Sequence, residues 1–271
     1  MYPIISELLT KNSSGTVFKC FGIFHWIYLM LMIGIAVFSI LRLWNKSDEE
    51  KKRGTNIFIN IVFALYIADF FIMPFVLGEI DVDKLPFHSC TSMCVMCFWS
   101  NHNRFLEKFR THFAMLGMIC NLMYMVYPSG VAAYEVHPFS YRAAQTLIFH
   151  SFMIIYGIHV ILFDKRGLAL RDCGKDAIIL LCLTCWAFIG NSLYSGELGS
   201  YSHDFNWFFI KQDPFYLLPE SIAPYLAPVL NFVAFFAIEL IARFIYTRVD
   251  AAVIAKREGA DIITTEASLQ N

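Results

Sequence analysis

A histidine and a cysteine lie two residues apart in the stretch LPFHSC, residues 85–90, where a loop leads into an apolar run. A cysteine acts as a nucleophile through its thiolate, which a neighbouring histidine can generate and stabilise. Cys90, Cys94 and Cys97 recur at helical spacing and share one face. Only Cys90 is near enough to the start of the run to be wetted and to ionise, so it is the candidate nucleophile.

A general base for this thiol is expected further along the chain. His150 lies in a later apolar stretch, and the two residues should reach similar depths below one surface. Acyl transfer through a covalent intermediate needs a thiolate, a base and donors for the oxyanion. The sequence therefore predicts Cys90 and His150 as a catalytic pair, although a lone histidine in a helix often only bonds a neighbouring backbone group.

Supporting roles are predicted for polar side chains that would otherwise be costly in apolar surroundings. Asp69 could orient His150, although a neutral, structurally hydrogen-bonded carboxyl group explains it equally well. Donors to the oxyanion could come from asparagines. The supporting set is Asp69, His88, Asn121, Asn191 and Asn206.

Composition places these residues in a membrane protein. Of the 271 residues, 58% are hydrophobic and only 16% are charged, whereas soluble domains carry about 25% charged residues. The formal net charge of −1 provides no basic field for nucleic acid. We also expect no cleavable signal peptide, because no basic segment precedes a short apolar core at the N-terminus.

Seven apolar segments predict an all-α bundle of seven transmembrane helices, since about 20 helical residues cross the hydrocarbon layer. The segments are 21–43, 56–78, 87–101, 109–127, 143–163, 176–194 and 225–247. Residues 1–20 would form an extracytoplasmic arm, residues 21–247 the transmembrane domain, and residues 248–271 a cytoplasmic tail. The aromatic connection 195–224 would be a lid on the outer surface or a re-entrant segment.

The distribution of positive charge predicts the orientation, because lysine and arginine are retained on the cytoplasmic side. With seven crossings, the connections alternate between rich and poor in these residues, and 16 of the 21 fall on one side. The N-terminus is then outside and the C-terminus in the cytoplasm. Cys90 and most of the supporting set would lie in the outer half of the bundle.

Two C-x₂-C pairs, Cys94/Cys97 and Cys182/Cys185, have a spacing that could bind zinc in a soluble chain. Here both pairs lie inside apolar segments, where four thiolates would be uncompensated charge. We expect these cysteines to be small packing residues, and we expect no metal and no cofactor.

Three motifs carry a resemblance to a known family: LPFHSC, FHSFMI around His150, and FNWFF in the last outer connection. They resemble the YwaF-like bacterial membrane proteins, which are similar to the eukaryotic acyltransferase transmembrane protein 164. The bacterial first motif is closer to L-P-L-H-L-C, and Phe87, Ser89 and Trp207 depart from the family pattern. The resemblance implies a cysteine acyl-enzyme with its cysteine and histidine at Cys90 and His150, and a location in a bacterial plasma membrane.

Two functions fit these observations. The first is a lipid acyltransferase whose nucleophile meets phospholipid ester carbonyls at the boundary between headgroups and tails. The second is a transporter or small-ligand binding protein, for which a water path should continue inward past His150 toward His159 and Glu239. Membrane lipids are the expected partners and nucleic acid is not; neither the substrate nor the oligomeric state follows from the sequence.

Overall fold

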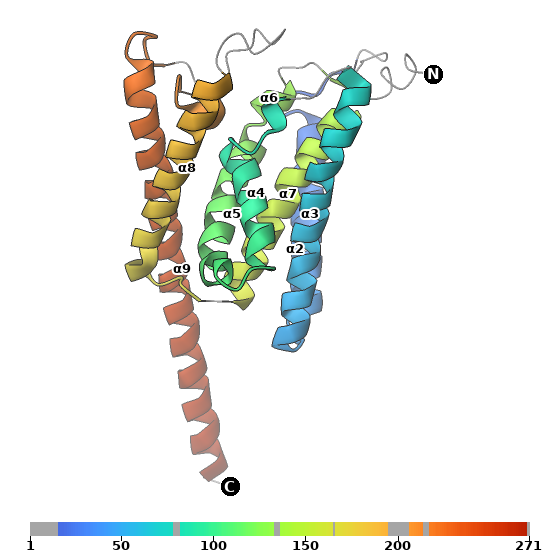
Figure 1. Cartoon of the computed structure of the whole chain (residues 1–271). Coiled ribbons are helices and arrows are strands. Elements are labelled where there is room, and N and C mark those ends of the chain that lie inside the picture. Colours follow the sequence, from blue (N-terminus) through green and yellow to red (C-terminus); the bar gives the residue numbers. More distant parts are fainter. Residues whose placement is uncertain are drawn as a thin grey trace.

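The protein is entirely helical in the part that the computed structural model describes, which is residues 16–77, 82–132, 136–164, 166–194, 206–213 and 217–269. The α-helices are α2 (Ile23–Leu43), α3 (Asp48–Leu77), α4 (Ser89–Ser100), α5 (Arg110–Val126), α6 (Ser129–Ala132), α7 (Tyr141–Phe163), α8 (Cys173–Tyr194) and α9 (Ala223–Leu269). Figure 1 shows the long helices running roughly alongside one another, with α4 and α5 in the middle.

Five helices are long and apolar enough to cross a membrane: Ile23–Leu43, Asp48–Ile72, Tyr141–Phe163, Leu170–Tyr194 and Ala223–Asp250. Much of their apolar surface faces outward, as on α2, where only three residues are buried. Such a surface suits lipid rather than water. The all-α, polytopic class is therefore confirmed, and the chain is a multi-pass integral membrane protein.

The other two predicted spans, 87–101 and 109–127, form shorter helices. α4 has 12 residues and α5 has 17, which at 1.5 Å per residue is about 18 Å and about 26 Å of helix. Most residues of α5 are buried, because it packs between α4 and α7. A helix enclosed by other helices need not match the thickness of the lipid, so its length is less constrained.

Small residues bring α5 and α7 close together. A Cβ atom at Gly157 of α7 would lie 2.5 Å from Met118 Cβ and 2.9 Å from the Ala114 carbonyl oxygen of α5. Close backbone approach at glycine is a common way for membrane helices to pack. The pair forms the centre of the bundle, to which α3, α4, α8 and α9 contribute further buried side chains.

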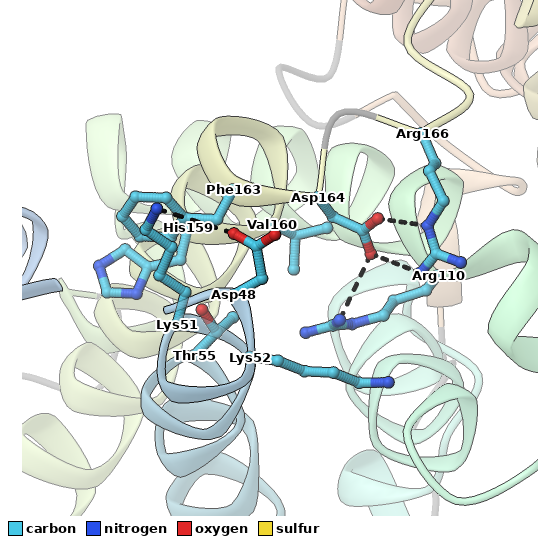
Figure 2. A pocket seen from close by; sticks show the side chains of 10 residues that line it. All are labelled: Asp48, Lys51, Lys52, Thr55, Arg110, His159, Val160, Phe163, Asp164 and Arg166. Atoms are coloured by element: carbon cyan, nitrogen blue, oxygen red, sulfur yellow. Dashed lines mark hydrogen bonds and ion pairs between the residues drawn. The ribbon is translucent and has the colours of Figure 1, made fainter. Parts of the chain in front are cut away.

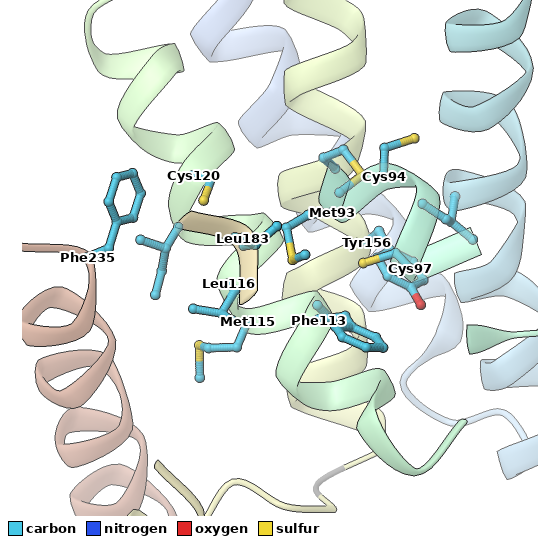
Figure 3. Close-up of a cluster of buried hydrophobic side chains, with 14 of the residues drawn as sticks. Met93, Cys94, Cys97, Phe113, Met115, Leu116, Cys120, Tyr156, Leu183 and Phe235 are labelled. Atoms are coloured by element: carbon cyan, nitrogen blue, oxygen red, sulfur yellow. The ribbon is translucent and has the colours of Figure 1, made fainter. Parts of the chain in front are cut away.

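The cysteines divide between the core and the surface. Cys94 and Cys97 of α4 are fully buried in the main apolar cluster with Cys120 (Figure 3), which confirms their packing role. Cys182 and Cys185 of α8 are exposed, so the expectation that this second pair packs in the core is wrong. α8 is apolar around its whole circumference, so its sequence does not reveal which face is buried.

Two features lie at the predicted ends of the transmembrane domain. Phe18, within the expected arm, is 1% exposed, and its N–H donates to the Val136 carbonyl at 3.0 Å. The last candidate span ends at Asp250, and α9 continues through the expected tail to Leu269. Residues 1–15 of the arm lie outside the described residues.

The connection 195–224 is described at 206–213 and from 217 onward, so the choice between a lid and a re-entrant segment lies partly outside the described residues. The described aromatic segment packs inward. Trp207 and Phe208 are buried at 0% and 2% exposure, in the short 3₁₀ turn Trp207–Phe209.

Candidate functional site

The LPFHSC stretch is held in place before α4 begins. The Pro86 carbonyl accepts hydrogen bonds from Ser92 Oγ and from Trp186 Nε1, both at 2.6 Å. The Phe87 ring packs against Trp186 and Trp207 at centroid distances of 4.9 Å. α8 and the aromatic connection therefore fix the position at which α4 starts, and the first and third sequence motifs are in contact.

Gly190 makes this contact possible. A Cβ atom there would lie 2.4 Å from the Phe87 ring, so any larger residue on α8 would displace the LPFHSC stretch. His88 caps α4 with an extended backbone, at φ −72° and ψ 146°. Cys90 follows as the second helical residue and is half-buried, which leaves its thiol near the end of the bundle as the sequence predicts.

His150 is buried in α7, at 5% exposure, and its ring stacks on Tyr124 at 3.8 Å with an interplanar angle of 15°. Its Nδ1 lies 2.7 Å from the Thr146 carbonyl. A carbonyl can only accept, so Nδ1 carries the proton and Nε2 carries the lone pair in the neutral ring. Nε2 is buried and has no hydrogen-bond partner among the described residues. In this tautomer Nε2 is the nitrogen that could accept a proton.

Asp69 is paired instead with other groups. The carboxylate, 1% exposed, accepts a hydrogen bond from Tyr141 Oη at 2.9 Å and forms an ion pair with Lys84 Nζ at 3.1 Å. These partners satisfy a buried charge. His150 Nδ1 is held by the Thr146 carbonyl, and Asp69 has the hydrogen-bonded structural role that the sequence left open.

Several side chains at this end of the bundle lie within electrostatic range of one or the other candidate catalytic residue. Cys90 interacts electrostatically with Tyr66, whose hydroxyl donates to the Lys84 carbonyl at 2.9 Å. Lys84 and His88 interact in turn with His150. Cys90, His88, His150 and Asp69 thus border the same end of the bundle. Sequence reasoning missed Tyr66 and Tyr141, which read as ordinary aromatic residues of an apolar segment.

The three asparagines divide between this group and the aromatic connection. Asn121 of α5 is fully buried; its Nδ2 donates to the Gly117 carbonyl at 2.6 Å and its Oδ1 has no hydrogen-bond partner among the described residues. Asn191 exchanges hydrogen bonds with the Trp207 backbone at 3.0 and 3.1 Å. Asn206 bonds the backbone of Lys211 and Gln212. Asn191 and Asn206 therefore hold the aromatic connection in place.

A second polar group lies deeper, toward the opposite end. Arg243 is fully buried, pairs with Glu239, and has Nη2 2.6 Å from Asp176 Oδ2. His112 lies 2.8 Å from the same carboxylate, so polar contacts join α5, α8 and α9. The i, i+4 spacing of Glu239 and Arg243 inside an apolar run was the available sequence signal.

On α7, Met153, Ile155 and Tyr156 follow His150 and are all 0% exposed, before His159 is reached. The Tyr156 hydroxyl accepts hydrogen bonds from Arg110 and Asn101. No group of three or more His, Cys, Asp or Glu side chains that could hold a metal occurs in the part of the chain that the structure describes.

Comparison with known families decides the classification. The model of the TMEM164 family matches residues 20–244, which is most of the chain. The chain belongs to the TMEM164 family. No curated protein and no solved structure matches it.

The TMEM164-family region extends from the start of α2 into α9 and includes all seven residues of the predicted site. It also includes the residues that position them, such as Trp186, Gly190 and Thr146. The family match therefore covers both the membrane bundle and the group around Cys90 and His150.

Proposed function

We propose that this TMEM164-family protein crosses the membrane seven times, with the N-terminus outside and the C-terminus in the cytoplasm. Two observations support this topology. Lysine and arginine alternate between rich and poor connections only if α4 and α5 are both counted as crossings. In Figure 1 these helices run alongside the five long ones.

We infer further that the protein is a lipid acyltransferase that works through a cysteine acyl-enzyme. The observation that carries this proposal is the state of His150. Its tautomer is fixed by the Thr146 carbonyl, and Nε2 is a buried lone pair without a hydrogen-bond partner among the described residues. A purely structural histidine would use both nitrogens, as His25 does with the Met125 carbonyl and the Phe21 N–H.

The proposed reaction has two steps. In the first, His150 Nε2 takes the proton of the Cys90 thiol, and the thiolate attacks the carbonyl carbon of a lipid ester. The ester C–O bond breaks, the acyl group remains on Cys90 as a thioester, and the leaving lyso-lipid oxygen receives the proton from Nε2. In the second step an acceptor hydroxyl attacks the thioester while Nε2 takes its proton. The C–S bond breaks, the acyl group stays on the acceptor oxygen, and the Cys90 thiolate receives the proton back from Nε2.

The location of the pair supports a lipid substrate. Cys90 is the second residue of its helix, so it lies close to the membrane boundary where lipid ester carbonyls occur. Exposed apolar side chains surround this part of the bundle, among them Phe71 and Met96. A phospholipid could therefore present its ester without leaving the membrane. Asn121 would contribute its second amide N–H to the oxyanion.

Intact-mass spectrometry of the purified chain with a phospholipid donor tests the proposal. We expect one added acyl chain that hydroxylamine removes and that Cys90→Ala abolishes. His150→Gln, which retains bulk but removes the base, should slow the formation of the adduct by a factor of 10² to 10⁴.

Cys182→Ala is the matched control, because Cys182 is exposed on a lipid-facing helix and lies outside the site. The amount of acyl adduct on Cys182→Ala, and its rate of formation, should equal those of the unchanged protein. An adduct that persists in Cys90→Ala, or none with any donor, would contradict the enzyme. Retention of unmodified lipid at the same site would instead favour a binding protein or transporter.

A further inference from the structure

A cleft of about 230 Å³ opens at the other end of the bundle, where α3 begins and α7 ends (Figure 2). It lies far along α3 and α7 from the group around Cys90 and His150. Its lining residues are Asp48, Lys51, Lys52, Thr55, Arg110, His159, Val160, Phe163, Asp164 and Arg166. A water molecule in the liquid takes up about 30 Å³, so the cleft can hold a group of several heavy atoms.

The cleft is electropositive. Four of its lining residues are lysine or arginine and two are aspartate. Glu107, beside the cleft, pairs with Lys52 at 2.9 Å and with Arg166 at 3.9 Å, so the excess of positive charge is one. Lys51 is the least neutralised of the four. Its Nζ lies 3.8 Å from Asp48, whose side chain is fully exposed, and such surface pairs contribute little. The same ammonium lies 5.7 Å from the centre of the Phe163 ring, at the wall of the cleft.

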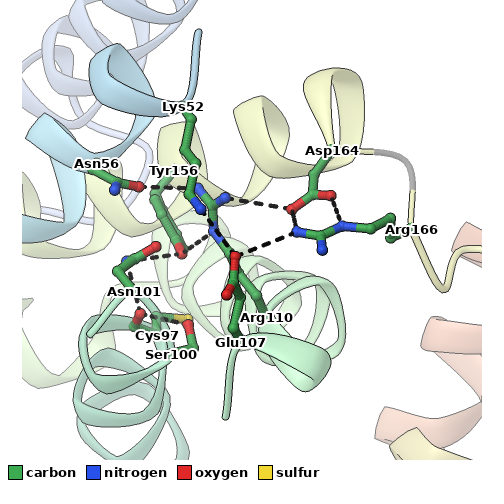
Figure 4. Close-up of polar contacts among 10 residues, drawn as sticks. All are labelled: Lys52, Asn56, Cys97, Ser100, Asn101, Glu107, Arg110, Tyr156, Asp164 and Arg166. Atoms are coloured by element: carbon green, nitrogen blue, oxygen red, sulfur yellow. Dashed lines mark hydrogen bonds and ion pairs between the residues drawn. The ribbon is translucent and has the colours of Figure 1, made fainter. Parts of the chain in front are cut away.

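The floor of the cleft is a rigid cation. Arg110 is 3% exposed, and its guanidinium is held by Tyr156 Oη at 3.3 Å, Asn56 Oδ1 at 3.0 Å and Asp164 Oδ2 at 3.4 Å (Figure 4). Asp164 also pairs with Arg166. Burial by itself would raise the pKa of Asp164, but the hydrogen bond and charge of Arg166 and the charge of Arg110 hold that pKa below its usual value. One carboxylate therefore faces two guanidinium groups.

Two buried polar atoms at the cleft lack hydrogen-bond partners among the described residues. Thr55 is 1% exposed, and its Oγ1 makes no hydrogen bond, although a helical threonine ordinarily bonds a carbonyl one turn earlier. It projects from α3 toward the α7 residues of the cleft (Figure 2). Lys51 and Thr55 are four residues apart and so lie on one face of α3.

His159 supplies the second atom, Nδ1, and is 0% exposed. Ser39 Oγ gives its proton to the Ala36 carbonyl, so His159 Nε2, 2.9 Å away, must donate to Ser39. In the neutral ring Nδ1 is then an acceptor. The cleft therefore offers cations, one hydroxyl and one acceptor together.

We propose that this cleft binds a phosphate group that carries a P–OH. The cations of Lys51 and Arg110 match its charge, the Thr55 hydroxyl can donate to a phosphate oxygen, and the P–OH can donate to His159 Nδ1. The monoanion of a phosphomonoester, whose second pKa is about 6, satisfies all three requirements. It can come from a lipid headgroup at the membrane surface or from a soluble phosphate compound.

Thermal unfolding of the full chain distinguishes these sources. The soluble probes, added to protein in neutral detergent, are inorganic phosphate, glycerol 3-phosphate and sulfate. The lipid probe is a nanodisc of phosphatidylcholine with or without phosphatidic acid. We expect stabilisation by phosphate and glycerol 3-phosphate, or by phosphatidic acid alone if the source is lipid. Sulfate should bind less tightly, because at neutral pH it carries no proton for His159.

The decisive variant is Lys51→Gln with Thr55→Val, which removes one charge and one hydroxyl with little change of shape. In this variant, the concentration of the stabilising phosphate probe that gives half of the full effect should rise at least about tenfold. Lys46→Gln is the matched control, because Lys46 is exposed, pairs with Glu50 and does not line the cleft; its value should stay within about twofold.

If the double variant does not fold, Lys51→Gln alone serves for the same comparison, with a smaller rise. The proposal is overturned if no probe stabilises the unchanged protein, or if the double variant responds to phosphate as Lys46→Gln does. Sulfate that binds as tightly as phosphate would remove the assignment of a P–OH. None of these measurements depends on acyl transfer.

Discussion

Replacement of Gly157 by alanine has two opposite effects on stability: a gain in helix propensity and a cost from overpacking. Alanine is favoured over glycine in a helix by about 1 kcal/mol. The added methyl group would lie 2.5 Å from Met118 Cβ and 2.9 Å from the Ala114 carbonyl oxygen. Neither atom is the end of a flexible side chain, so α5 and α7 must move apart to accept it.

Overpacking of this kind costs about 1–3 kcal/mol, and carbon atoms prefer separations of about 3.5–4.0 Å. The overlap at Gly157 is large, so we place its cost in the upper half of that range. After the gain in helix propensity, Gly157→Ala should lower the free energy of unfolding by about 1–2 kcal/mol. Gly34→Ala is the control, because nothing lies within 4 Å of a Cβ atom there; it should gain up to about 1 kcal/mol.

Reversible unfolding of the two variants side by side, in the same detergent or bilayer mimic, gives the difference directly. We expect Gly157→Ala to be less stable than Gly34→Ala by about 2–3 kcal/mol. Equal stabilities, or a more stable Gly157→Ala, would mean that α5 and α7 are not in the close contact described here. Formation of the thioester should also slow in Gly157→Ala, because α7 carries His150 and α5 carries Asn121.

Three further outcomes are expected. Arg243→Met should lower the free energy of unfolding by about 3–5 kcal/mol, because it leaves buried carboxylates without their cation; Lys175→Met, at a half-exposed pair, should cost less than about 1 kcal/mol, and equal costs in unfolding assays would contradict the buried network. Tyr141→Phe removes a donor from the buried Asp69 carboxyl group and should cost about 1–3 kcal/mol by the same assay; no change would mean that the Tyr141–Asp69 hydrogen bond does not stabilise the fold. The pKa of Asp164 is lowered in the folded protein, so its contribution to stability is complete above its unfolded pKa of 3.8 and is lost as the pH falls through the folded value; Asp164→Asn should flatten this acid limb, and an unchanged limb in acid unfolding curves would refute the assignment.

Hydropathy located the long helices well, because a helix that crosses the hydrocarbon layer must be apolar over about 20 residues. The expected spans 21–43 and 143–163 agree closely with Ile23–Leu43 and Tyr141–Phe163. The same criterion is weaker for α4 and α5, which are shielded by protein and need not match the hydrocarbon thickness. The proposal that those two also cross the membrane rests on the charge pattern.

Pairing between helices was much harder to predict. Asp69 required a partner on general grounds, but Tyr141 is 72 residues away, and nothing local selects it over the other tyrosines. Cys182 and Cys185 lie on a helix that is apolar all round, so their exposure could not be read from periodicity. The sequence indicated which groups needed partners, and packing in three dimensions determined which partners they found.

The double hydrogen bond to the Pro86 carbonyl has a practical consequence for handling the protein. Pro86 lies just before α4, the helix that carries Cys90. Its carbonyl is bonded to Ser92 of α4 and to Trp186 of α8, so α8 holds the start of α4 in place. A detergent that loosens α8 from its neighbours would leave the protein helical yet shift its thiol. Preparations in a lipid bilayer and in harsh micelles should therefore be judged by the reactivity of that thiol rather than by their circular dichroism.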